Sequence, residues 1–172
     1  MKMRFITRVG ASLAAAFALS GPAFATGIAP PNYAFLINGP GNLIKNGGQA
    51  IWPCSWNFKM QSGPSIGGNP PQAAGGTMTG GTAPAGTNCS VMTIDPTTWS
   101  ITSSNATGGS GVFHGLTFLQ SGSTFCSTYS DVPFTIANNG DAPSTFTFNY
   151  PTIGQCTFAA NMNTAADLNV VP

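Results

Sequence analysis

Large apolar side chains recur at every second position between Ala50 and Gln61. Successive side chains of a β-strand point to opposite faces, so this spacing predicts a strand with one buried face. The polar residues between them, such as Asn57 and Lys59, would face water. The alternating residues are Trp52, Cys54, Trp56, Phe58 and Met60.

Similar short runs follow along most of the chain, separated by glycine, proline, asparagine and aspartate. Turn signals about every 8–12 residues are typical of sandwiches and barrels built from short strands. We predict an all-β fold, a single antiparallel β-sandwich or jelly-roll-like domain over residues 26–172. Residues 158–168 are the only stretch of this domain with a spacing of apolar residues that suggests a helix, and the pattern is weak. The expected strands are 33–38, 42–45, 50–61, 89–94, 98–104, 111–119, 124–129, 132–137, 145–150, 155–162 and 168–171.

Residues 61–87 break this pattern. The segment holds eight glycines and four prolines, with Ile66 and Met78 as its large apolar residues. So little apolar surface predicts a flexible loop or a projecting hairpin. Deletion of residues 63–86 is then expected to leave the domain folded. The glycine pairs lack the Gly-Lys-Ser/Thr sequence of a phosphate-binding loop.

The first 25 residues have the order of an export signal. Lys2, Arg4 and Arg8 precede a short apolar run at 13–19, and Ala23-Phe24-Ala25 supplies the small residues of a cleavage site. A bilayer-spanning helix needs about 20 apolar residues, so this run is too short, and no later segment qualifies. The sequence predicts an exported protein, extracellular or at the cell surface, with the periplasm as the alternative.

Charged residues make up 5% of the chain, against about 25% in average proteins. After removal of residues 1–25, two lysines and four aspartates leave a formal charge of −2. A nucleic-acid partner is excluded because no basic stripe is available to neutralise phosphates. Such a surface suits contact with apolar material, with sugar polymers or with further copies of the chain. The alternative is a secreted domain that threonine, serine and asparagine keep soluble.

Four cysteines lie after the export signal: Cys54, Cys89, Cys126 and Cys156. An even number in an exported chain predicts two disulfides, and the absence of Cys-x-x-Cys argues against zinc. Four cysteines allow three pairings. We favour Cys54–Cys89 and Cys126–Cys156, since each closes a loop of about 30 residues and stabilises by roughly 3–4 kcal/mol in the chain-entropy model.

The residues available for catalysis are few. A Ser-His-Asp site could use only His114, the single histidine, which lies in an apolar strand and is expected to be structural or exposed. The four aspartates are mostly placed beside turn-forming residues, so paired-carboxylate chemistry and calcium binding are not indicated. We therefore expect a non-enzymatic protein without catalytic residues, metal or cofactor.

Four aromatic residues are candidates for contact with sugar or lipid. They are Trp52, Trp56, Phe58 and Trp99. Alternating aromatic residues in a strand are more often core residues, so the core is the favoured interpretation and surface contact is the alternative.

Four blocks of the sequence occur in an order that matches a known family. The blocks are Phe35–Pro40 with Asn42–Lys45; Pro53 and Cys54 with Phe58; Gly111–Gly115 with Cys126 and Val132–Thr135; and Phe148–Tyr150 with Gly154–Thr157. Together they resemble the small exported activators of alkane oxidation of the PraA/PraB type. The resemblance implies an exported, non-enzymatic protein associated with growth on hydrocarbons and with the cell surface, and it supplies no catalytic residues.

Two functions follow as hypotheses. The first is an exported accessory protein that meets hydrocarbon, lipid or surface polymer. The second is a structural subunit that assembles into an extracellular fibre or biofilm matrix through unpaired strand edges.

Cleavage of the export signal is predicted to follow Ala25. Protein recovered from outside the cell should begin at Thr26 when its N-terminus is sequenced. Recovery of extracellular protein that retains Met1 would contradict the prediction.

Overall fold

The computed structural model describes residues 26–45, 51–127, 130–149 and 152–172. All regular secondary structure in these residues is β, which confirms the predicted fold class. The predicted export signal, residues 1–25, lies outside the described residues.

The described chain forms fourteen strands, and all their pairings are antiparallel. They are β1 (Gly27–Ala29), β2 (Ala34–Lys45), β3 (Ile51–Ser62), β4 (Gly75–Ala85), β5 (Met92–Ile94), β6 (Thr97–Asn105), β7 (Gly108–His114), β8 (Thr117–Gln120), β9 (Ser123–Ser127), β10 (Asp131–Asn139), β11 (Ala142–Phe148), β12 (Thr152–Ile153), β13 (Cys156–Thr164) and β14 (Asn169–Val171).

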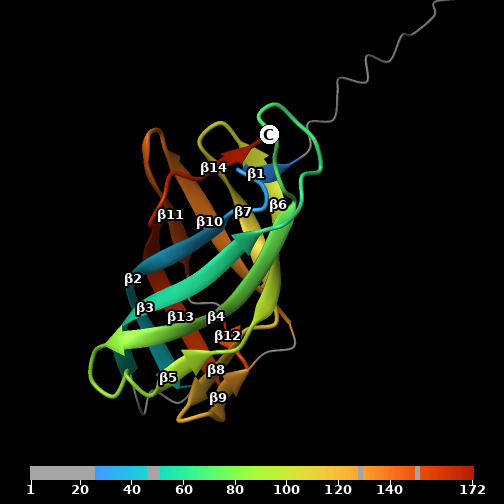
Figure 1. Ribbon diagram of the computed structural model, residues 1–172. Helices are drawn as coiled ribbons and strands as arrows, with labels where there is room; N and C mark the ends of the chain where they lie inside the picture. Colours follow the sequence, from blue (N-terminus) through green and yellow to red (C-terminus); the bar gives the residue numbers. More distant parts are fainter. Residues whose placement is uncertain (1–25, 46–50, 128–129, 150–151) are drawn as a thin grey trace, which may run out of the picture.

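Eight of these strands close into a barrel, so the predicted sandwich is wrong. Their order is β3-β2-β13-β11-β10-β7-β6-β4, and β4 pairs back with β3 (Figure 1). A sandwich requires two separate sheets, whereas here every neighbouring pair is hydrogen-bonded around the circle.

Strand β4 closes the barrel, although its residues were predicted to be loop or hairpin. A β-carbon on Gly75 would lie 2.2 Å from the carbonyl oxygen of Trp99, and one on Gly76 would lie 1.9 Å from that of Gln61. Glycine alone permits this approach to β6 and β3. The composition that indicated a loop therefore allows a tightly held strand. Deletion of residues 63–86 is now expected to open the barrel rather than leave it folded.

Two further strands depart from the predicted boundaries. Strand β2 continues through Gly39-Pro40-Gly41, which was expected to end the first strand. A β-carbon on Gly39 would lie 2.3 Å from the carbonyl oxygen of Asn161, so this glycine serves close strand approach rather than a turn. The run at 111–119 is instead divided into β7 and β8 by Gly115, whose φ of 79° favours glycine. The weak helical candidate at 158–168 falls largely in β13.

Aromatic rings fill the barrel. Phe148 lies near the centre of the cluster, with ring centroids 5.2 Å from Phe158, 5.8 Å from Phe113 and 6.0 Å from Phe58. Trp56 packs edge-on against Phe158, and its indole N–H donates to the carbonyl oxygen of Gly41 at 3.2 Å. Burial of each such ring contributes about 1.5–3 kcal/mol, so the alternation predicted from the sequence supplies the main stabilising term.

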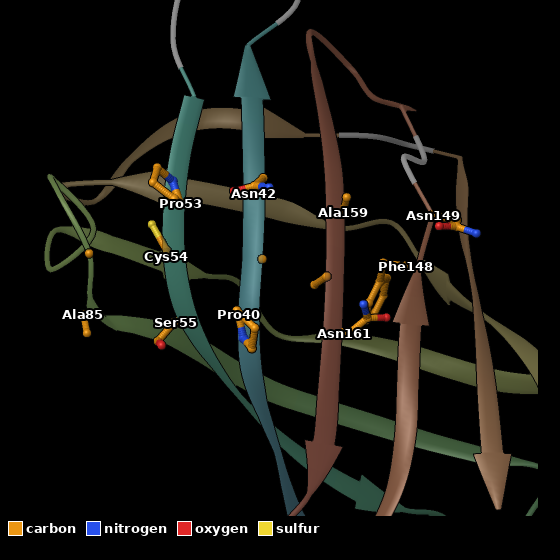
Figure 2. Close-up of a pocket in the computed structure, with 13 residues that line it drawn as sticks. Pro40, Asn42, Pro53, Cys54, Ser55, Ala85, Phe148, Asn149, Ala159 and Asn161 are labelled. Atoms are coloured by element: carbon orange, nitrogen blue, oxygen red, sulfur yellow. The ribbon is translucent and has the colours of Figure 1, made fainter.

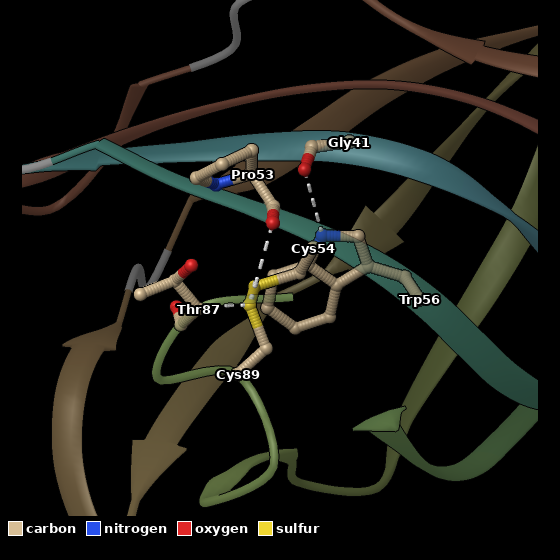
Figure 3. Close-up of a disulfide and its surroundings, with 6 residues drawn as sticks. All are labelled: Gly41, Pro53, Cys54, Trp56, Thr87 and Cys89. Atoms are coloured by element: carbon tan, nitrogen blue, oxygen red, sulfur yellow. Dashed lines mark hydrogen bonds between the residues drawn. A yellow bond between two sulfur atoms is a disulfide. The ribbon is translucent and has the colours of Figure 1, made fainter. Parts of the chain in front are cut away.

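Both disulfides have the favoured pairing, which is confirmed. Cys54 on β3 is joined to Cys89 in the turn between β4 and β5, with the Cα atoms 5.7 Å apart (Figure 3). Cys126 on β9 is joined to Cys156 on β13, with a Cα separation of 5.9 Å. Cys89 Sγ also lies 3.5 Å from the carbonyl oxygen of Pro53. This is a close contact only, since a disulfide sulfur carries no proton to donate.

Short strands lie at the two ends of the barrel (Figure 1). At one end β1 pairs with β14, and β5, β8 and β9 extend from β4 at the other. Asn138 fixes β14 by two hydrogen bonds: its amide nitrogen donates to the carbonyl oxygen of Val170 at 2.7 Å, and its amide oxygen accepts from the Val170 N–H at 2.9 Å.

Gly76→Ala is predicted to lower the free energy of unfolding by about 1–3 kcal/mol, because the new methyl group would force β4 away from β3. Urea denaturation measures the change. Thr82→Ala, an exposed substitution on the same strand, is the control and should stay within about 0.5 kcal/mol of the parent. Equal stability of Gly76→Ala and the parent would contradict the proposed closure.

Candidate functional site

The four aromatic candidates for surface contact lie mostly in the core. Trp56 and Phe58 are fully buried and Trp99 is 2% exposed, because each occupies an inward position of its strand. Only Trp52 is half-buried, with its ring centroid 4.7 Å from that of Phe125. The core interpretation therefore holds for Trp56, Phe58 and Trp99, and surface contact through these three residues is wrong.

An apolar groove lies on the outer wall instead, where the segment after β3 meets β4 and β6. We call it the Ile66 groove, and its volume is about 420 Å³. None of its nine lining residues is charged. They are Gly63, Pro64, Ile66, Ala74, Gly75, Gly76, Thr77, Trp99 and Ser100.

Backbone hydrogen bonds hold the walls of the Ile66 groove. The Gly63 N–H donates to the carbonyl oxygen of Gly75 at 2.7 Å, and the Ile66 N–H donates to that of Gln72 at 2.9 Å. Ile66 is nevertheless 49% exposed, an unusual position for a large aliphatic side chain. Gly75 and Gly76 contribute only backbone atoms to the lining of the groove.

A polar cluster continues from the groove at Ser100. Ser100 Oγ lies 3.0 Å from His114 Nε2, and His114 Nδ1 lies 2.9 Å from Asp131 Oδ1. The three residues come from the neighbouring strands β6, β7 and β10, with Asp131 directly opposite His114 in the register. The sequence indicates His114 as the one available base, but its partners Ser100 and Asp131 follow only from the register of the strands.

The partners decide where the protons lie. A carboxylate only accepts, so His114 Nδ1 must carry the hydrogen that bonds to Asp131. In the neutral imidazole Nε2 then accepts the hydroxyl proton of Ser100. This is the order of contacts found in serine hydrolases.

The surroundings differ from those of a hydrolase. The side chains of His114 and Asp131 are 42% and 58% exposed, whereas the triad aspartate of a hydrolase is buried. The N–H of Ile101, next to Ser100, already donates to the carbonyl oxygen of Ala74 at 2.7 Å and is not free to stabilise an oxyanion. The cluster is thus suited to hydrogen bonding at the end of an apolar groove.

A second groove of about 550 Å³ crosses the outer faces of β3, β2 and β13 (Figure 2). None of its lining residues is charged. Asn42, Asn149 and Asn161 offer amide donors and acceptors, and small residues such as Gly41 and Ala159 also line the groove. Amide groups of this kind match the hydroxyls of a sugar polymer.

Two further features are absent from the described residues, a metal site and a membrane-spanning helix. No group of three or more histidine, cysteine or acidic side chains is arranged to hold a metal ion there. The same residues contain no helix with the length and apolar character needed to cross a membrane.

The fold and the site define an all-β, disulfide-linked protein with uncharged surface grooves. The whole chain, residues 1–172, matches the family model described as alkane oxidation protein activator PraA/PraB-like, and the chain belongs to this family. The resemblance inferred from the four sequence blocks is thereby confirmed. Comparisons with curated proteins and with solved structures found no match.

Proposed function

We propose that this protein is an exported accessory factor that contacts hydrocarbon chains through the Ile66 groove and does not itself catalyse their oxidation. The observation that carries the proposal is an apolar, uncharged groove on the outer wall of a member of an alkane oxidation activator family. Hydrocarbon contact requires apolar surface accessible from outside, and the barrel interior is filled by its own aromatic rings.

Export is supported by chemistry as well as by the predicted signal. Two disulfides persist in oxidising compartments such as the periplasm and the extracellular space. We propose that the mature chain starts at Thr26 and acts at the cell surface or in the medium.

The exposed position of the Ser100–His114–Asp131 cluster supports the non-catalytic role. Water competes for each hydrogen bond there, and the backbone beside Ser100 is engaged in strand pairing. Stabilisation of a developing oxyanion by free, preorganised donors is the largest contribution to acyl transfer in most hydrolases.

Self-assembly into a fibre or biofilm matrix is the second candidate. Strand β9 ends the β5-β8-β9 extension within the described chain, and its outer edge could pair with a strand of another copy. Electron microscopy of secreted protein, together with gels of heated samples, distinguishes the two functions. Fibres or heat-resistant assemblies would favour the structural subunit.

Ile66→Ser is predicted to weaken hydrocarbon binding about tenfold, because it removes the most exposed aliphatic wall of the groove. Binding of radiolabelled alkane to the purified secreted protein measures the effect. Val91→Ser is the matched control: Val91 is 42% exposed but does not line the Ile66 groove.

Unchanged alkane binding in Ile66→Ser would contradict this assignment of the groove. An equal loss in Val91→Ser would show that general surface hydrophobicity, not the groove, binds the alkane.

A further inference from the structure

We infer that the Ile66 groove preferentially binds hydrocarbon chains that end in a hydroxyl group, with Ser100 Oγ accepting a hydrogen bond from that hydroxyl. This inference rests on the proposed function and specifies its ligand. Ser100 carries it, because this residue both lines the apolar groove and belongs to the polar cluster.

The direction of the existing hydrogen bonds leaves Ser100 as an acceptor. When the imidazole of His114 is neutral, its Nδ1–H donates to Asp131 and its Nε2 accepts a hydrogen bond from the Ser100 hydroxyl. The lone pairs of Ser100 Oγ remain available. A ligand head group that meets this oxygen must therefore donate a proton.

This requirement distinguishes four classes of ligand. An alkane has no polar hydrogen to donate, and an ether offers only an acceptor. A carboxylate would place its negative oxygens against the Ser100 lone pairs and near the Asp131 carboxylate, which repels them. A primary alcohol donates its hydroxyl proton to Ser100 while its chain lies against Ile66 and Pro64.

The preferred ligand is thus the class of molecule formed when one oxygen atom is inserted into a C–H bond of an alkane. An accessory protein with this preference would hold the product of the first oxidation step more tightly than the starting hydrocarbon.

Two isomers test the head group at constant size and composition. n-Octanol and heptyl methyl ether have the same atoms, but only the alcohol donates a hydrogen bond. We expect the secreted protein at pH 8 to bind the alcohol about three- to tenfold more tightly, the range for one hydrogen bond. Displacement of a fluorescent apolar probe measures both affinities, and octane and octanoate complete the series.

Ser100→Ala should bring alcohol affinity down to that of the ether and leave ether affinity unchanged. Ser103→Ala is the matched control, since Ser103 is an exposed serine on the same strand whose hydroxyl bonds to Ser110 instead. It should retain the alcohol preference. Circular dichroism establishes that both variants fold.

The outcomes distinguish a failure of the inference from a failure of the proposed function. Equal binding of the alcohol and the ether overturns the inference but leaves chain binding in the groove intact. Binding of none of the four ligands, or binding unaffected by Ile66→Ser, overturns the proposed function as well. Hydrolysis of p-nitrophenyl octanoate that is lost in Ser100→Ala would also overturn the inference, because Ser100 would then act as a nucleophile.

Discussion

Closure of the barrel depends on how closely β4 can approach both β3 and β6. At Gly75 and Gly76 the neighbouring carbonyl oxygens occupy the space that a side chain would need. This contact turns an open sheet into a barrel and encloses the ring cluster around Phe148. Gly75 and Gly76 also line the Ile66 groove. The same closely paired backbone therefore belongs both to the closure of the barrel and to the candidate site.

Most strands could be predicted because their side chains alternate between core and solvent. The run from Trp52 to Met60 shows this, as do the residues that became β10 and β13. Strand β4 was not predicted, because it contains few large apolar residues. It is held by close backbone contacts, which leave no periodic pattern in the sequence. The choice between a sandwich and a barrel could not be predicted for a related reason. A barrel forms only if β4 pairs with β3, and this non-local contact is not encoded by either strand alone.

The candidate site shows the same division between local and non-local information. His114 could be singled out from composition, since it is the single histidine. Its two partners follow only from the pairing of β6 with β7 and of β7 with β10. The alternation favoured a core role for Trp56, Phe58 and Trp99 over surface contact, and their inward positions on β3 and β6 place them in the core. Most of the groove is built from the segment 61–87, which was predicted to be a loop or hairpin, while Trp99 and Ser100 come from a strand that was predicted.

Connectivity alone does not make the Ser100–His114–Asp131 cluster a catalytic site. In a hydrolase the same three contacts act in a dry pocket, beside free backbone donors that await a developing negative charge. On the outer wall of this barrel the strand hydrogen bonds already use those donors, and water reaches the imidazole and the carboxylate. What the three residues retain in this setting is a fixed direction of hydrogen bonding, which leaves Ser100 Oγ as an oriented acceptor at one end of an apolar groove. Such an acceptor can discriminate between ligands by their head groups without breaking a bond in any of them.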